Sequence, residues 1–101
     1  MDWTVGQIME AIAAAGCDES TLVLFTSDNG APANHVAVQD ARGSNAPFSG
    51  YKGQILEGGI RMPAMARWPG KVAAGRQSDQ LVATYDMFTT MVSLVGGCCY
   101  T

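Results

Sequence analysis

The chain has 101 residues, enough for one small domain or for part of a larger one. Apolar residues make up 48%, which argues against disorder, and the net charge of −3 is small. The six basic residues are scattered singly and give no electrostatic footprint for nucleic acid, so we expect no such partner.

No apolar run in the sequence approaches the length of a membrane span, so we expect none. The first three residues lack the basic start of a signal peptide, and we expect no secretion signal in this sequence. The three cysteines, Cys17, Cys98 and Cys99, match no metal-site or redox spacing. They are interpreted as free thiols.

The chain begins with a predicted helix over residues 3 to 15, because apolar residues recur at positions 5, 8, 9 and 12. Asp2 is its predicted N-cap and Gly16 its predicted stop. After a polar link, Thr21 to Thr26 is a short and continuously apolar strand. Such a run is typical of a strand buried on both faces of a parallel sheet.

Residues 30 to 59 show almost no periodicity and contain six glycines and two prolines. An irregular connection of this length is uncommon in a compact domain and is usually functional or mobile. A second strand is predicted from Pro63 to Trp68, with a turn at Pro69-Gly70. Residues 81 to 84 read as a brief extended piece. Asp86 then resembles an N-cap for a final helix, which ends at Gly96-Gly97.

The predicted order is helix, strand, long loop, strand, helix, which is typical of a layered α/β protein. A strand buried on both faces needs strand neighbours, and this sequence supplies at most one or two. We therefore predict that the chain is part of a larger α/β domain.

Asp28 and Asn29 follow the first strand at its carboxyl end, where open α/β sheets bind their ligands. A carboxylate and an amide carbonyl are hard oxygen donors that suit calcium or magnesium. The alternative is a tight turn, because Asn-Gly is a strong hairpin signal. The residues alone leave both interpretations open.

Lys52 lies between Gly50 and Gly53, so its backbone has room to approach a ligand, and its ammonium group suits an anionic oxygen. The alternative is a solvated surface lysine. Glu57 and Arg61 flank Gly58-Gly59, and we expect them to hold the loop through a charge-assisted hydrogen bond.

His35 is the only histidine, and it is interpreted as a surface residue because no partner spacing surrounds it. Ser27 and Ser44 lack the context of a nucleophile elbow, which argues against a serine hydrolase.

Three segments, "TLVLFTSDNG", "GSNAPFSGYKGQILEGGIRMPAMARWPG" and "YDMFTTMVSLVGG", resemble in order and spacing the later part of the sulfatase catalytic domain. The resemblance extends from Asp2 to Gly97 and is strongest to the arylsulfatase A and N-acetylgalactosamine-6-sulfatase branch. It implies that residues 1–101 are a partial sulfatase catalytic domain, a fragment of an alkaline-phosphatase-like three-layer sandwich. It also implies sulfate ester substrates and a lysosomal or secreted enzyme.

In such enzymes a cysteine or serine within Cys/Ser-x-Pro-x-Arg is oxidised to formylglycine, whose hydrate attacks sulfur, while calcium steadies the sulfate oxygens. By this resemblance Asp28 and Asn29 match calcium ligands, and Lys52 matches a lysine that binds the substrate sulfate.

The sequence departs from the family in one important respect, because it contains no Cys/Ser-x-Pro-x-Arg motif. We therefore expect formylglycine only in an upstream part that is absent here, together with further calcium ligands, and we expect the chain alone to be inactive. One alternative is a catalytically inactive truncated sulfatase-like protein. Another is a different hydrolase of the alkaline phosphatase superfamily, such as a phosphodiesterase or phosphonate hydrolase, with an unmodified nucleophile and two metal sites.

Overall fold

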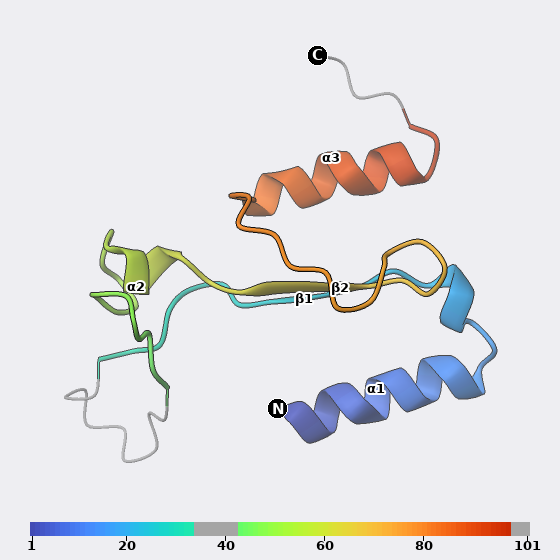
Figure 1. The fold of residues 1–101 in the computed structure, drawn as a ribbon, viewed down its shortest axis with the longest axis horizontal. Coiled ribbons are helices and arrows are strands. Elements are labelled where there is room, and N and C mark those ends of the chain that lie inside the picture. The colour runs from blue at the N-terminus through green and yellow to red at the C-terminus, as the bar shows by residue number, and fades with distance from the viewer. Residues whose placement is uncertain (34–42, 98–101) are drawn as a thin grey trace.

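The computed structural model describes residues 1–33 and 43–97, and it has the predicted order of elements with one short α-helix and one 3-10 turn added. In chain order the elements are α1 (Asp2–Ala14), the 3-10 turn η1 (Asp18–Ser20), β1 (Val23–Thr26), α2 (Glu57–Ile60), β2 (Ala64–Arg67) and α3 (Thr84–Leu94) (Figure 1). The predictions for His35, Cys98 and Cys99 fall outside the described residues. In the piece predicted as extended at 81 to 84, residues 81–83 form no strand, Ala83 has an extended backbone, and Thr84 already belongs to α3.

The two strands form an antiparallel ribbon, with Val23 opposite Arg67 and Thr26 opposite Ala64. Among the described residues β2 is the one partner of β1, and it is antiparallel, so no parallel neighbour is seen there. β1 is half-buried over most of its length and β2 is exposed, so the expected burial on both faces is also not seen. Antiparallel pairing places the carboxyl end of β1 beside the amino end of β2. The long loop therefore leaves and re-enters the ribbon at one end (Figure 1).

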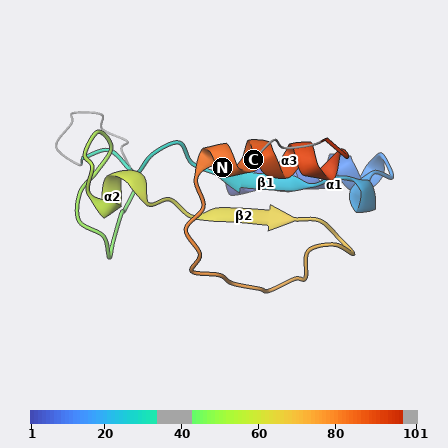
Figure 2. The ribbon, with the colours of Figure 1, turned by 90° about the horizontal axis from the view of Figure 1, so that it is seen from above.

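The two longer helices lie on opposite sides of this ribbon. Figure 1 shows β1 and β2 almost superimposed, with α1 on one side and α3 on the other, and Figure 2 separates the two strands. The arrangement is an α/β fragment with mixed helices and a two-stranded sheet, as the sequence pattern indicates.

Both helices end as predicted but begin differently. Gly16 has a φ of +67° after α1, and Gly96 has a φ of +80° after α3, a conformation that glycine adopts without steric penalty. At the start of α1 the N-cap is Met1 and not Asp2. At the start of α3 the N-cap is Ala83, and the Asp86 carboxylate accepts the Ala83 N–H at 2.7 Å. Asp86 thus reaches back from inside the first turn, where a carboxylate also complements the helix dipole.

The end of the ribbon away from the long loop is tied to η1. The Arg67 guanidinium donates two hydrogen bonds to the Asp18 carboxylate, at 2.8 and 3.0 Å, and Trp68 Nε1 donates to the Glu19 carbonyl at 2.8 Å. The hydrogen bond from Arg67 is the main reason why the pKa of Asp18 lies below its usual value.

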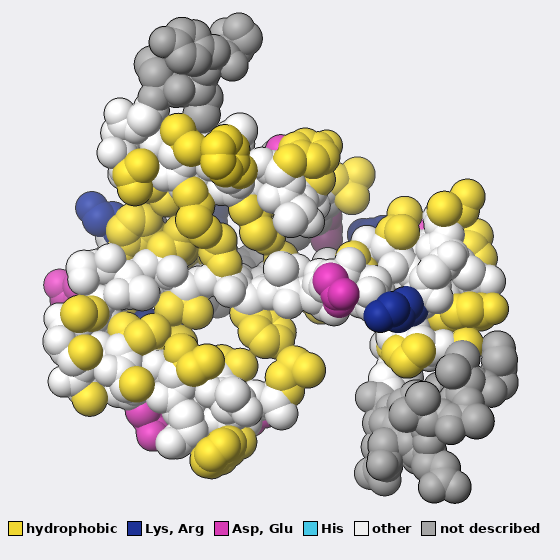
Figure 3. Space-filling model, turned by 180° about the vertical axis from the view of Figure 1, so that it is seen from behind, with side chains coloured by type: hydrophobic (Ala, Val, Ile, Leu, Met, Phe, Trp, Pro, Cys, Tyr) yellow, Lys and Arg dark blue, Asp and Glu magenta, His cyan; other side chains and the backbone are white. Residues whose placement is uncertain are grey.

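The described residues bury very little apolar side chain. Gly30, Ala33, Gly58 and Gly59 are the buried ones among them, and three of these have no side chain. Trp3, on α1, is 76% exposed, and Figure 3 shows hydrophobic side chains spread over the molecular surface. The apolar faces of α1 and α3 are therefore largely uncovered. Within residues 1–33 and 43–97, no helix has the length and apolarity needed to cross a membrane.

Candidate functional site

The turn after β1 presents the Asp28 carboxylate to solvent and holds Asn29 in place. Ser27 Oγ donates to the Asn29 carbonyl at 2.9 Å, and Asn29 Nδ2 donates to the Gly30 carbonyl at 3.1 Å. The Asn29 side-chain nitrogen is thereby engaged within the turn. The amide oxygen is the atom that is left to coordinate a metal ion. Among the described residues, no cation lies within ion-pair distance of Asp28.

Residues 31–33 form no strand after Asn29-Gly30, and among the described residues β1 pairs with the distant β2, so no hairpin is seen there. The segment after the turn instead lies against α2, which is distant in sequence. The Gly30 N–H donates to the Gly59 carbonyl of that helix at 3.0 Å. A Cβ atom at residue 30 would collide with the carbonyl oxygen of Gly58. Glycine is therefore required at position 30 for the close approach of two backbones.

The Gly58-Gly59 pair forms the other side of this contact, in the first turn of α2. The Gly58 N–H donates to the Ser49 carbonyl at 2.8 Å, and a Cβ at residue 58 would collide with the Gly50 carbonyl. The pair thus holds the turn after β1 on one side and the Lys52 loop on the other. The sequence did not predict a helix here, because four residues are too few to show helical periodicity.

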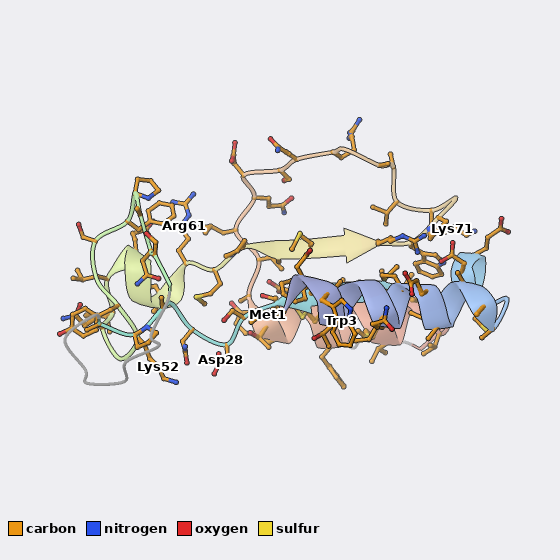
Figure 4. All side chains as sticks on the ribbon, turned by 90° about the horizontal axis from the view of Figure 1, so that it is seen from below. Met1, Trp3, Asp28, Lys52, Arg61 and Lys71 are labelled. Atoms are coloured by element: carbon orange, nitrogen blue, oxygen red, sulfur yellow. The ribbon has the colours of Figure 1, made fainter. Side chains whose placement is uncertain are left out.

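Lys52 is joined to the Asp28-Asn29 turn through its backbone. Its N–H donates to the Ala31 carbonyl at 3.0 Å. That bond occupies the group which we expected to approach a ligand, and it leaves the exposed ammonium side chain for that role. Gly50 and Gly53, with φ values of +99° and +90°, bend the loop around Lys52. Figure 4 shows Asp28 and Lys52 at the same end of the molecule, extending to the same side.

Asn45 is a residue of this site that the sequence did not reveal. Its Oδ1 accepts the Ala31 N–H at 2.7 Å, and its Nδ2 donates to the carbonyls of Ala31 and Gly50, each at 3.0 Å. The segment Ser44-Asn45-Ala46-Pro47 has the composition of an ordinary turn, so no local signal distinguishes this asparagine.

The predicted pair between Glu57 and Arg61 is confirmed, with 2.8 Å between the carboxylate and guanidinium. The Arg61 guanidinium also lies 4.7 Å from the centre of the Phe48 ring, a cation–π contact with the preceding loop. Arg61 extends away from Lys52 in Figure 4, in keeping with the structural role expected for it.

The chemistry of this end of the molecule suits an anionic ligand and a hard cation. Asp28 and Asn29 offer a carboxylate and an amide oxygen, and Lys52 offers a positive charge. The part of the chain described by the structure contains no group of three or more His, Cys, Asp or Glu side chains placed for a metal ion. Two donors fit part of a calcium shell, which takes six to eight oxygens. The roles of Asp28, Asn29 and Lys52 stay predictions.

Comparison with known proteins identifies relatives of this chain. The Sulfatase family model matches residues 1–97. The chain is 45% identical over 96 residues to N-acetylgalactosamine-6-sulfatase of Mus musculus and 43% identical to that of Homo sapiens. It is 38% identical over 98 residues to steryl-sulfatase of Rattus norvegicus. These matches cover 95% of this chain but 17–18% of the relatives, so the chain spans less than a fifth of their length. The predicted resemblance is confirmed: the chain belongs to the sulfatase family.

Proposed function

We propose that residues 1–101 are one portion of a larger sulfuric ester hydrolase, here called the full-length enzyme, and that they carry part of its calcium- and sulfate-binding site. Family membership over residues 1–97 supports the class of reaction. The single observation that supports the site is the hydrogen bond from the Lys52 N–H to the Ala31 carbonyl. This bond joins the lysine loop to the turn that presents Asp28 and Asn29.

In the proposed site Asp28 and Asn29 hold calcium together with ligands from elsewhere in the enzyme. When bound, the ion supplies positive charge that polarises the sulfate oxygens. Asp28 contributes a full negative charge to the ion, whereas Asn29 contributes only a dipole. We propose the three-layer alkaline-phosphatase-like sandwich as the architecture of the whole domain, with α1 and α3 on opposite sides of the β1–β2 ribbon.

Lys52 has a separate role in this proposal. Its ammonium group donates to a sulfate oxygen and offsets the negative charge on the sulfuryl group as the leaving oxygen departs. No carboxylate among the described residues pairs with this ammonium, so the charge is available to a ligand. The nucleophile lies outside this chain in the proposal, because the 101 residues contain no Cys/Ser-x-Pro-x-Arg motif.

The test measures calcium content and steady-state hydrolysis of a chromogenic aryl sulfate in variants of the full-length enzyme. Asp28→Ala should lose calcium, and its kcat should fall by about 10²–10³-fold, the range found when one preorganised electrostatic group is removed. Asn29→Ala should lose less of both. Lys52→Ala should retain calcium, yet its kcat/KM should fall by a similar factor.

Two matched controls come from the same chain. Lys71→Ala removes the chain's other lysine, which lies at the opposite end of the molecule in Figure 4. Asp79→Ala removes a carboxylate from an exposed loop. Both should keep normal calcium content and turnover. Full calcium occupancy with normal turnover in Asp28→Ala would refute the metal site. Turnover of phosphodiesters or phosphonates in preference to sulfate esters would refute the reaction class.

A further inference from the structure

We propose that Asn45 is a positioning residue that couples the calcium ligands to the sulfate-binding lysine. This inference rests on the proposed function, and it assigns to Asn45 no contact with substrate or metal. Its basis is the position of one side chain between two segments that are far apart in the sequence. Asn45 binds the backbone of Ala31, two residues beyond Asn29, and of Gly50, two residues before Lys52.

Ala31 is the junction of the two segments. Asn45 binds both of its backbone groups, accepting its N–H at 2.7 Å and donating to its carbonyl at 3.0 Å. The same carbonyl accepts the Lys52 N–H at 3.0 Å. Asn45 orients the Ala31 carbonyl that accepts the Lys52 N–H. A change at residue 45 therefore affects both the Asp28-Asn29 turn and the lysine loop.

The second Nδ2 hydrogen of Asn45 extends this connection to the lysine loop. It donates to the Gly50 carbonyl at 3.0 Å, directly before the bend that carries Lys52. Asn45 is itself half-buried, so an alternative partner from water is less accessible than at the surface. The Asn45 amide and the Lys52 N–H, which both bind the Ala31 carbonyl, therefore together fix the separation between the Asp28-Asn29 turn and the base of the lysine side chain.

Other contacts hold each segment separately. The Gly30 N–H donates to the Gly59 carbonyl, and the Gly58 N–H donates to the Ser49 carbonyl. The turn and the lysine loop should therefore stay close to α2 when Asn45 is lost, while their mutual register loosens. Catalytic groups need to be held within about 0.5 Å of the productive geometry. A small loss of register is therefore sufficient to uncouple the calcium ligands from the sulfate-binding lysine.

The coupling is measurable as a thermodynamic linkage. If calcium and Lys52 bind the same sulfate, calcium raises the affinity for inorganic sulfate by a defined factor, and sulfate raises calcium affinity equally. Couplings of this kind are typically about 5–150-fold. Loss of register should reduce that factor without abolishing either binding event. A purely structural role would lower stability and leave the factor unchanged.

The experiment measures the affinity of the full-length enzyme for inorganic sulfate by calorimetry, calcium-loaded and after EGTA treatment, at matched ionic strength. The parent should bind sulfate about 10-fold more tightly when calcium-loaded, and Asn45→Ala should reduce this ratio to below about 3-fold. Asn45→Asp keeps the size and the acceptor for the Ala31 N–H but loses both donors, and it should behave like Asn45→Ala. Ser44→Ala is the control, because among the described residues Ser44 Oγ accepts only a local hydrogen bond from the Ala46 N–H, and it should keep the parent ratio.

Each outcome is decisive. A parent without any calcium effect on sulfate affinity overturns the proposed function and this inference with it. A parent with coupling that both Asn45 variants retain overturns this inference alone and leaves the proposed function standing. If neither Asn45 variant folds, Asn45 has a global structural role and the positioning role is refuted. Loss of coupling in the Asn45 variants, with Ser44→Ala unchanged, supports it.

Discussion

Substituting Gly30 by alanine tests whether the turn that carries Asp28 and Asn29 depends on backbone contact with α2. The new Cβ would collide with the Gly58 carbonyl oxygen and would lie 2.8 Å from the Gly58 carbonyl carbon. Both are backbone atoms, so no flexible side chain can move away. Overpacking costs about 1–3 kcal/mol and the weakened Gly30–Gly59 hydrogen bond about 0.5–1.5 kcal/mol, together about 1.5–4.5 kcal/mol.

Gly6→Ala is the matched control, because a Cβ at Gly6, within α1, meets nothing within 4 Å. Alanine is the better helix former, so this variant should be more stable by about 0.5–1 kcal/mol. Native-state hydrogen exchange of the full-length enzyme is the assay, since it reports local opening at the Gly30 amide. Relative to the parent enzyme, exchange of the amide at position 30 should accelerate in Gly30→Ala and stay unchanged in Gly6→Ala. Equal protection of the amide at position 30 in both variants would refute the requirement for close approach between the backbones of Gly30 and Gly58.

Three further outcomes follow from the same structure. The isolated chain should not hydrolyse a chromogenic aryl sulfate, because it lacks the formylglycine motif; turnover above a blank, abolished by a mutation in the chain, would contradict this. The isolated chain should also show no sharp thermal transition, since its described residues bury almost no apolar side chain, and strong amide protection at residues 22 to 25 would be evidence against it. The Asp18–Arg67 pair should stabilise the full-length enzyme fully above the usual pKa of an aspartate. Because the pKa of Asp18 is lowered in the fold, that contribution should fade as pH falls through the lowered value; Asp18→Asn should flatten this part of the stability–pH curve, and an unaltered curve would show that the pair contributes nothing.

Local patterns predicted the helices and strands well, because each depends on residues close in sequence. Helical spacing placed α1 within one residue at each end, and Pro69-Gly70 closed β2 as expected. Sheet direction was not predictable from the apolar run alone. Continuous hydrophobicity is typical of burial on both faces, but it says nothing about which strand lies alongside.

In the candidate site, too, the features that depend on local sequence were predictable and the contacts between distant segments were not. The types of Asp28, Asn29 and Lys52 point to their chemistry, and the Glu57–Arg61 pair follows from charges four residues apart. Asn45 and the contact between Gly30 and Gly58 were missed, because their partners are distant in sequence and are backbone atoms. Hydrogen bonds to backbone carbonyls place no requirement on the partner's residue type, so they leave no pattern to read.

A crystal structure of the full-length enzyme with calcium and inorganic sulfate tests the central claim most directly. The account predicts a calcium ion with one Asp28 carboxylate oxygen and the Asn29 amide oxygen about 2.3–2.6 Å away, the range of calcium–oxygen bonds in proteins. It also predicts Lys52 Nζ about 2.7–2.9 Å from an oxygen of the sulfate at the same site, as in charge-assisted hydrogen bonds. Calcium bound without Asp28, or sulfate bound without Lys52 while calcium is present, would contradict it.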